Sequence, residues 1–505
     1  MSVVLACDLG GTHFRAALVD QHGHSVAQHT HVSPSTALDD RGRSETDPDD
    51  WWETLLALAA ELAETAPQAF AKVKAVALGG ITRTQVLIGA DGRPLRRAIT
   101  WRDVRAEPSI RQFVAQLPQR HPETIQVNAF HPLARLAWLR DHEPDTLRAA
   151  TAVLEPKDYL NFRLTGVRST DRISMARLIA AATPAANEPD LLTAAGIAPS
   201  ILPPIVAPCD RVGRIEGAAP APFNTLAGIP VFSGSNDTWS AVVGLGALQP
   251  DHAYNLSGTT EVFGVLSETA HNAEGLITID WGGLHQLGGP GQNGADTVAW
   301  LLSLLGLADA GRPFPADALA ALLAGRRNPQ ALLFLPYLQG ERVPWWDAAL
   351  RGAFVGLNRS HTSTDMAWAV LEGVAFHNKL VLNRAEEALG HAVSEIRFGG
   401  GAASNPLWRQ IKADICERAV VVGAASEPGI VGAAAVAWTG LGVFASLREA
   451  QQKLARIAQR CEPDPARTAF YRPLFDLYRR SASALAPISH QLVALQRDDF
   501  AAPPS

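Results

Sequence analysis

Cysteine is scarce in this chain, and the few cysteines present form no metal-binding or disulfide pattern. The 505 residues include four of them, namely Cys7, Cys209, Cys416 and Cys461. Because these positions are far apart, neither a zinc site nor a disulfide framework is expected. A reducing, cytoplasmic location is the expectation that follows.

The chain also lacks an excess of basic charge and any long hydrophobic run. Its 44 Lys and Arg stand against 50 Asp and Glu, a net charge of −6, so no broad basic surface for nucleic acid is predicted. No apolar run approaches the ~20 residues of a membrane-spanning helix, and no signal peptide is expected at the N-terminus. The sequence therefore favours small-molecule partners over nucleic acid or membrane, and it leaves a homodimer open.

The length and the order of apolar segments predict two α/β domains. A chain of 505 residues with 47% hydrophobic content exceeds one core. Strand-like and helix-like segments alternate along it. We expect an N-terminal domain over 1–247, a C-terminal domain over 248–490 and a flexible tail over 491–505. Residues 184–228, rich in Pro, Ala and Gly, are expected to form a long surface connection.

A short motif occurs twice, once in each expected domain. Asp8-Leu-Gly-Gly-Thr-His-Phe-Arg15 aligns with Asn255-Leu-Ser-Gly-Thr-Thr-Glu-Val262 so that a Gly-Thr pair coincides. Each copy predicts a β-hairpin with its tight turn at the glycines. Backbone N–H groups and hydroxyls in such turns can bind a polyphosphate, although two ordinary hairpins would show the same pattern. The candidate phosphate contacts are Gly10, Gly11, Thr12, His13, Gly258 and Thr259.

Two aspartates follow predicted strands. Asp237 comes after the strand 229–233 and a Gly-Ser-Asn turn, and it opens a helix. At the carboxyl end of a sheet it could accept the proton of a hydroxyl group during phosphoryl transfer, or it could merely cap the helix. Asp8 ends the first strand and could hold Mg²⁺ through water. Asp237 is the second metal candidate.

A run of three glycines precedes another predicted helix. Gly399-Gly400-Gly401 is followed by Ala-Ala-Ser404-Asn405-Pro406, in which Asn405 can cap the helix and Pro406 suits its first turn. Without side chains, the glycines let a flat base or ribose approach the backbone. The alternative is a plain strand-to-helix turn.

A polar cluster with one aromatic residue suggests a polyol site. The segments Thr82–Gln85 and Ile99–Arg105 supply paired donors, an acceptor and an indole ring, although a surface hairpin with charged edges would look alike. The candidate substrate contacts are Arg83, Thr84, Trp101, Asp103 and Asn236.

In order, these motifs resemble the FGGY carbohydrate kinases, a branch of the actin-like ATPase fold, over nearly the whole chain. The most specific match is Gly352-Ala-Phe-Val-Gly356-Leu357, then seven residues, then the segment 365–373. Pro336–Pro344 and Glu155–Gly166 agree as well, and Trp101–Arg105 resembles the substrate-side motif of the family.

The resemblance implies two actin-like (ribonuclease H-like) domains hinged about a central nucleotide and sugar cleft. It implies ATP and Mg²⁺ as co-substrate and cofactor, and Asp237 as the general base. The two Gly-Thr turns would hold phosphates, and Gly400, Gly401 and Asn405 would touch the adenosine half of ATP. Gly294 is a further candidate beside the nucleotide.

The chain departs from its relatives around the sugar. Ile81-Thr82-Arg83 stands where xylulokinases carry Met-His-Gly, and Arg83-Thr84 matches half of the Arg-Glu pair of glycerol kinases. Asn236 replaces the first of two consecutive aspartates found in many pentulose kinases. The expected substrate is a ketose or polyol, with D-xylulose first and with ribulose, gluconate, glycerol or a tetritol left open.

Two other classes of protein remain alternatives. A non-catalytic sugar or ATP sensor could use the same scaffold, but the presence of Asp8, Asp237 and both Gly-Thr turns argues against it. An actin-like or chaperone-type ATPase would hydrolyse ATP without sugar, and it leaves the sugar-side cluster and the 352–373 motif unexplained.

Overall fold

The computed structural model describes residues 2–34, 39, 42–185, 187–258, 260–308 and 316–495. The chain forms two compact units. The first contains Met1–Gly246, Asp280–Gly282 and Glu427–Arg456, and the second contains the remainder. The segment Glu427–Arg456 thus packs with the first unit, although a division of the sequence at 247 assigns it to the second.

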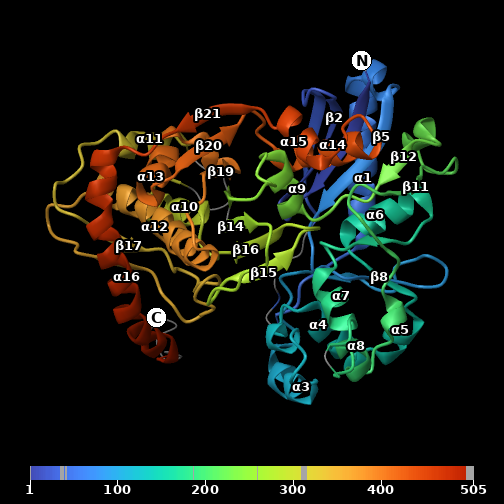
Figure 1. Cartoon of the computed structure of the whole chain (residues 1–505), viewed down its shortest axis with the longest axis horizontal. Helices are drawn as coiled ribbons and strands as arrows, with labels where there is room; N and C mark the ends of the chain where they lie inside the picture. Colours follow the sequence, from blue (N-terminus) through green and yellow to red (C-terminus); the bar gives the residue numbers. More distant parts are fainter. Residues whose placement is uncertain are drawn as a thin grey trace, which may run out of the picture. The chain divides into compact units, whose positions relative to one another are not determined.

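The first unit is built on one mixed sheet with the strand order β11-β12-β5-β1-β2-β3 (Figure 1). Its strands are β1 (Val3–Leu9), β2 (His13–Asp20), β3 (Ser25–Val32), β5 (Val73–Gly80), β11 (Arg211–Arg214) and β12 (Pro230–Phe232). β1 pairs antiparallel with β2 and parallel with β5, which pairs parallel with β12. The predicted hairpin is confirmed, with Asp8 opposite Arg15 across it.

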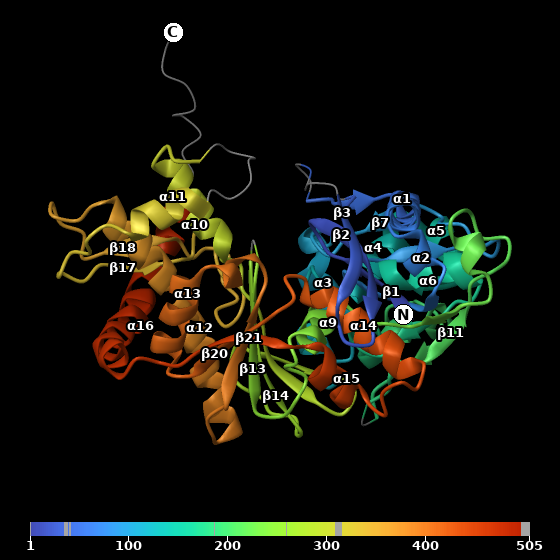
Figure 2. The ribbon, with the colours of Figure 1, turned by 90° about the horizontal axis from the view of Figure 1, so that it is seen from above.

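The two faces of this sheet are covered by different helices. Odd-numbered residues of β1, such as Leu5 and Cys7, share a core with α1 (Pro48–Thr65) and α6 (Pro156–Thr165). The other face carries α14 (Pro428–Gly440), which contacts β1 and β5 and crosses α9 (Asp237–Gly244). Figure 2 shows β1 and β2 with α1 on one side and α14 on the other. α15 (Leu447–Leu454) packs on α14 and α9.

The prediction that residues 184–228 form a long surface connection is wrong, because this segment contains short helices and strands with buried side chains. Leu191 and Phe223 are fully buried, and β11 pairs with β12 at the edge of the sheet. The apolar residues are dispersed among Pro, Ala and Gly, so that no periodicity reveals them. The other elements of the first unit are β4 (Glu45–Thr46), α2 (Pro67–Phe70), β6 (Val86–Ile88), β7 (Ala98–Ile99), η1 (Glu107–Ser109), α3 (Ile110–Gln116), η2 (Thr124–Gln126), α4 (Pro132–His142), α5 (Pro144–Ala149), β8 (Ala152–Leu154), β9 (Thr170–Asp171), α7 (Ala176–Ala182), α8 (Leu191–Ala194), η3 (Pro199–Ile201), β10 (Ile205–Val206) and η4 (Phe223–Leu226).

The second unit repeats the central arrangement in a sheet with the order β15-β16-β14-β13-β19-β20-β21. Its strands are β13 (His252–Ser257), β14 (Glu261–Ser267), β15 (Ile277–Asp280), β16 (His285–Pro290), β19 (Glu395–Gly399), β20 (Ala419–Gly423) and β21 (Ile457–Cys461). β13 pairs antiparallel with β14 and parallel with β19. Both copies of the Gly-Thr motif therefore form a hairpin whose first strand borders a parallel strand.

The core of the second unit is organised by the long helix α12 (Ser363–Leu389). A capping box of Thr362 and Asp365 begins this helix, and Gly390, at a φ of 77°, ends it. In Figure 1 α12 and α13 lie side by side, and α16 contacts both. The other elements are α10 (Ala295–Leu304), α11 (Ala316–Leu323), β17 (Leu333–Leu335), β18 (Ala353–Val355), η5 (Gly401–Ser404), α13 (Pro406–Cys416) and α16 (Pro465–Ala494).

The C-terminal end of the described chain is helical. α16 continues through Ala494, past the predicted start of a flexible tail at 491, and residues 496–505 lie outside the described part. Among the helices that the structure describes, none combines the length and apolar character that a bilayer crossing requires.

The α9–α14 crossing predicts a sharp sensitivity to one methyl group. A Cβ added at Gly432 of α14 would overlap the backbone carbonyl of Ser240 in α9. Since backbone cannot move aside as a side chain does, Gly432→Ala should lower the free energy of unfolding by about 1–3 kcal/mol. Urea unfolding measures the change. Gly217→Ala, whose added Cβ meets no atom within 4 Å, is the control, and equal midpoints for the two variants would contradict the prediction.

Candidate functional site

The carboxyl ends of β1, β5 and β12, which run parallel in adjacent positions, carry most of the candidate residues of the first unit, namely Asp8, Arg83, Thr84, Asn236 and Asp237. The chain is tied together just beyond these strand ends. The Ile81 N–H donates to the Leu9 carbonyl at 2.8 Å, and the Gly80 N–H donates to the Ser235 carbonyl at 3.2 Å. Parallel sheets place their ligand sites at this edge.

Asp237 is the first residue of α9, and Asn236 caps that helix. The Oδ1 atom of Asp237 accepts the Thr238 N–H at 2.7 Å. Burial raises the pKa of Asp237 to about 6, against the opposing hydrogen bonds from Thr238. The carboxylate is therefore ionised at neutral pH and remains a better proton acceptor than an exposed aspartate.

Asp8 lies near Asp237 and faces the first turn of α14. Burial raises the pKa of Asp8 to about 7, and the negative charge of Asp237 adds to this effect. A Cβ at Gly429 would overlap the Asp8 carboxylate, so only glycine allows the helix to approach so closely. Nearby, Arg15 forms an ion pair with Glu427 at 3.0 Å. Neither Gly429 nor this ion pair was predicted, because Glu427 and Gly429 are more than 400 residues from Asp8 in the sequence.

The two carboxylates suit a cation held partly through water. The Asp8 Oδ1 atom is enclosed and has no hydrogen-bond partner, and an orphaned carboxylate oxygen beside a second carboxylate is the hard-oxygen donor set that Mg²⁺ prefers. Across the described residues no group of three or more His, Cys, Asp or Glu side chains could hold a metal ion. Water or a ligand would supply the other coordination positions.

The turn of the first hairpin presents backbone groups beside an indole ring. The Gly10 N–H closes the turn on the His13 carbonyl at 3.0 Å, and the Thr12 side chain is exposed. A Cβ at Gly11 would lie 4.0 Å from the Trp101 ring. Trp101, predicted on the substrate side, thus lies against the predicted phosphate turn within this unit.

Arg83 and Thr84 follow β5 and are held by a buried carboxyl group. The N–H groups of Arg83 and Thr84 donate to the two carboxyl oxygens of Glu155, at 3.1 and 3.0 Å. Burial raises the pKa of Glu155 to about 8, while the backbone N–H of Thr84 acts in the opposite direction. Thr84 is completely buried, and its hydroxyl accepts the backbone N–H of Trp101 at 3.2 Å. Thr84 therefore holds the backbone of Trp101 and has no exposed surface of its own.

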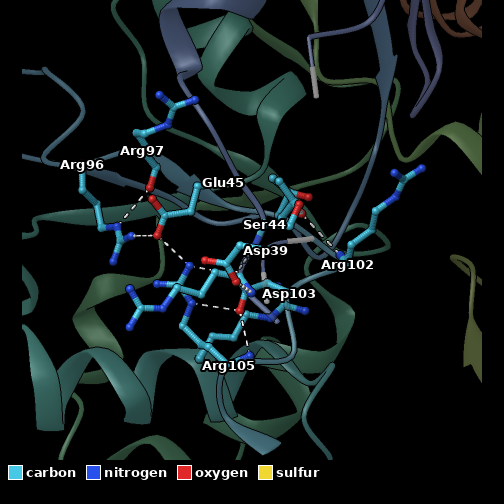
Figure 3. A network of polar contacts seen from close by, with 12 residues as sticks. Asp39, Ser44, Glu45, Arg96, Arg97, Arg102, Asp103 and Arg105 are labelled. Carbon is cyan, nitrogen blue, oxygen red and sulfur yellow. Dashed lines mark hydrogen bonds and ion pairs between the residues drawn. The ribbon is translucent and has the colours of Figure 1, made fainter. Parts of the chain in front are cut away.

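Asp103 lies in a separate buried network (Figure 3). Its carboxylate accepts the Ser44 N–H at 2.7 Å and the Arg105 side chain at 2.9 and 2.7 Å. Arg105 also pairs with Glu45. Because Asp103 is 0% exposed and both its oxygens are engaged, the structure favours a positioning role over the predicted contact with substrate.

Asn236 uses its side-chain oxygen within the protein. This oxygen accepts the Trp239 N–H at 2.8 Å and so caps α9. Only the Nδ2 group of this side chain can serve as a donor to a hydroxyl. Next to it, the Ser235 hydroxyl donates to Asp171 at 2.8 Å, and Asp171 pairs with the fully buried Lys157 at 2.9 Å. The sequence showed Lys157 only within the 155–166 motif and gave no sign of this ion pair.

The candidate residues of the second unit also meet at strand ends. The Gly258 carbonyl accepts the N–H of Ala295, the first residue of α10, at 3.0 Å, and Gly294 caps that helix. A Cβ at Gly400, which has a φ of 88°, would overlap the Ser257 carbonyl. Asn405 caps α13 by accepting the N–H groups of Leu407 and Trp408. Gly401 is exposed, and Thr259 lies outside the described residues.

A buried polar cluster beneath the second hairpin was not predicted. Glu261 accepts hydrogen bonds from Asn255 and Ser257, and it pairs with Lys412 of α13 at 3.5 Å. Lys412 also donates to the Asn255 side-chain oxygen at 2.7 Å. Residues on both sides of the turn therefore contact α13, the helix that follows the three glycines Gly399–Gly401.

Burial of the Asp8 carboxyl, with the charge of Asp237 as a second cause, predicts an unusual dependence of stability on pH. Because the pKa of Asp8 is raised in the folded state, this carboxyl favours folding at low pH, and the benefit is lost as pH rises from about 4 to about 7. Without divalent cations, Asp8→Asn should therefore unfold at a higher temperature than the unsubstituted chain at pH 8. A shift of this size corresponds to at most about 4 kcal/mol.

Thermal melts at pH 4 to 8 in the presence of a chelator measure this difference, which should vanish toward pH 4. Asp145→Asn, at an exposed position on α5, serves as the control. A variant at position 8 that is less stable than the unsubstituted chain at pH 8 would contradict the prediction.

Comparison with known proteins extends over both units. Residues 3–244 match the N-terminal domain of the FGGY family of carbohydrate kinases, and residues 253–441 match its C-terminal domain. The xylulose kinase of Bacillus subtilis (strain 168) is 28% identical over 490 residues, which cover 95% of this chain and 96% of that protein.

Two crystal structures share the fold over nearly their whole length. Xylulose kinase from Rhodospirillum rubrum superimposes with a TM-score of 0.84 at 27% identity, over 97% of this chain and 100% of that one. Gluconate kinase from Lactobacillus acidophilus gives a TM-score of 0.84 at 26% identity, over 97% and 99%. The fold is the two-domain, actin-like one that the family resemblance implied, and the chain belongs to the FGGY family of carbohydrate kinases, which are ATP-dependent sugar kinases.

Proposed function

We propose that this chain transfers the γ-phosphate of MgATP to a hydroxyl group of D-xylulose, with Asp237 as the general base. The choice of sugar is supported by similarity to xylulose kinases over nearly the full length of both chains. Ribulose, gluconate, glycerol and tetritols are the alternatives, and similarity to a gluconate kinase structure supports the second of them.

The observation that carries this proposal is the environment of Asp237. The carboxylate begins a helix at the carboxyl end of β12, close to the Asp8 carboxylate, and burial brings its pKa to about 6. A base with such a pKa is ionised at neutral pH and accepts a hydroxyl proton more readily than an ordinary aspartate. Phosphoryl transfer to an alcohol needs a group of this kind beside the attacking oxygen.

Asp8 would hold Mg²⁺, with Asp237 as a second ligand or as a partner through water. The enclosed, unpartnered Oδ1 atom and the raised pKa of Asp8 both favour this role. When bound, the ion neutralises charge on the transferring phosphoryl group. The close approach of α14, which Gly429 permits, keeps bulk water from one side of the Asp8 carboxylate.

The nucleotide would be bound by backbone groups at the two hairpin turns and at the three glycines Gly399–Gly401. The turn Gly10–His13 and the turn containing Gly258 and Thr259 are assigned to phosphates. Gly294, Gly400, Gly401 and Asn405 are assigned to the nucleoside half of ATP. Gly258 and Gly294 are linked through the start of α10, and Gly400 abuts the end of β13, so these positions are near one another within the second unit.

The sugar would contact Arg83, Trp101 and the Nδ2 group of Asn236. Arg83 and Asn236 lie just beyond β5 and β12, and Trp101 packs on Gly11. Thr84 and Asp103 would act through these residues, since both side chains are fully buried. A cytoplasmic location is proposed with this activity.

Removal of the base tests the mechanism. Asp237→Asn keeps the size of the side chain and removes its ability to take a proton, so kcat should fall by about 10²–10⁴-fold. Binding of ATP should be retained, and the melting temperature should not fall; at pH 8 without divalent cations it should rise, because burial raises the pKa of Asp237 as it does that of Asp8. A coupled assay of ADP release measures turnover, and Asp145→Asn is the surface control. Turnover of Asp237→Asn within a few-fold of the unsubstituted chain would remove Asp237 from the role of base.

A panel of sugars tests the substrate. ADP release with D-xylulose, D-ribulose, gluconate, glycerol and erythritol should show the highest kcat/KM for D-xylulose. A thermal-shift series with a non-hydrolysable ATP analogue should rank the same ligand first, because a ligand at 100 times its Kd stabilises the folded state by about 2.7 kcal/mol. A higher kcat/KM for another panel member would reassign the substrate. Stabilisation without ADP release would indicate a sensor, and sugar-independent release would indicate an ATPase.

A further inference from the structure

The residue that follows Thr82 at the end of β5 has an unusual backbone. Arg83 has a φ of 55°, in the left-handed region that non-glycine residues rarely adopt. A residue in this region persists only where surrounding contacts impose it. Both peptide groups that flank Arg83 should therefore be firmly held, and the structure shows which side chains hold them.

Glu155 holds the donor side of this segment. Its Oε1 atom accepts the Arg83 N–H at 3.1 Å, and its Oε2 atom accepts the Thr84 N–H at 3.0 Å. The Thr82 hydroxyl donates to the Ser174 carbonyl at 2.9 Å and lies 3.4 Å from the Glu155 Oε1 atom. Glu155 is 3% exposed and stands immediately before α6, whose packing fixes its backbone.

Arg135 holds the acceptor side. This residue of α4 is 0% exposed, and its Nη1 group donates to the carbonyl oxygen of Arg83. The Nη2 group donates to the Phe130 carbonyl at 2.7 Å. The planar guanidinium thus joins two carbonyl groups at once, a geometry that lysine cannot reproduce. Burial lowers the pKa of Arg135 to about 10, and the side chain remains charged at neutral pH.

We propose that Glu155 and Arg135 form a buried clamp that imposes the left-handed conformation of Arg83 and thereby aims its side chain at the sugar. Both are positioning residues, because each contacts the backbone of the 82–84 segment and neither needs to touch the substrate. This inference rests on the proposed role of Arg83 in binding sugar. It names Glu155 and Arg135 as determinants of sugar affinity that act from beneath the site.

The clamp has a specific consequence for kinetics. If the 82–84 segment relaxes to an ordinary conformation, the Arg83 side chain changes direction while Asp237 and Asp8 keep their own supports on α9 and β1. Binding of sugar should therefore weaken without equal loss in binding of ATP or in the chemical step. A loss of general stability would instead lower every parameter together.

Glu155→Gln tests the clamp with little change in shape. A carboxyl oxygen keeps a lone pair for an N–H donor whether or not it is protonated, but an amide NH₂ does not. One of the two N–H groups therefore loses its acceptor. We expect at least tenfold faster hydrogen exchange in peptides spanning 82–84 and at least a tenfold higher KM for the sugar. The kcat at saturating sugar and the KM for ATP should change by less than twofold.

Glu372→Gln is the matched control. Glu372 is buried, like Glu155, but it belongs to the second unit. Its carboxyl pairs with Arg327 and accepts the Tyr471 hydroxyl at 2.7 Å. Unchanged exchange at 82–84 in Glu155→Gln, an unchanged KM for sugar, or the same changes in Glu372→Gln would overturn the proposal. If Glu155→Gln does not fold, Arg135→Lys should give the same two changes, because lysine cannot join both carbonyls.

The two readouts separate this inference from the proposed function. If the unsubstituted chain releases no ADP with any sugar of the panel, the proposed function fails. Hydrogen exchange then decides the clamp by itself, with faster exchange at 82–84 supporting it and unchanged exchange overturning it.

Discussion

The proximity of two poorly solvated carboxylates, Asp8 and Asp237, is the constraint on which the site in the first unit depends. Asp8 lies next to the carboxyl end of β1, and Asp237 follows β12 at the start of α9. Their mutual repulsion is maintained by the surrounding fold. The β1–β2 hairpin fixes Asp8, the Asn236 cap fixes the start of α9, and Gly429 admits α14 against the Asp8 side chain. Such a charge arrangement destabilises the free protein and suits one that takes up a cation with its substrate.

The two units use different buried side chains to hold their glycine turns and the strand ends beside them. Each places a glycine turn beside parallel strand ends, and each has buried polar side chains that hold segments next to that turn. In the first unit the supports are Glu155, Lys157 and Asp171, which hold the segments after β5 and β12. In the second unit Glu261 and Lys412 tie the hairpin to α13. A loop that binds a ligand through its glycine backbone has few side chains of its own to fix its conformation. Contacts from neighbouring buried side chains fix it instead.

The sequence was sufficient to predict the features that depend on local pattern. The apolar run of β1, the hairpin at Gly10–Thr12 and the start of α9 at Asp237 each show in a few adjacent residues. The repeated motif and the family resemblance gave the two-domain architecture. Elements such as α8 and β11 escaped prediction, because their apolar residues are isolated among Pro, Ala and Gly.

The supporting residues could not be predicted in the same way, since each contact joins distant segments. Glu155 is 71 residues from Thr84 in the sequence, and Lys412 is 151 residues from Glu261. The alternation of apolar and polar residues reveals which face of a strand is buried, but it does not reveal which buried charges meet. For the same reason the sequence predicts that Asp103 contacts the substrate, because the motif 101–105 does not reveal that both oxygens of its carboxylate accept hydrogen bonds from Ser44 and Arg105.

The return of Glu427–Arg456 to the first unit has a consequence for how this protein can be divided. A fragment that stops at residue 247 would lack α14, leaving one face of β1 and β5 bare and the Asp8 carboxylate open to solvent. The unit that holds the proposed base is therefore complete only after the ribosome has passed residue 456. The first unit can therefore complete its packing during synthesis only after most of the second unit has been made.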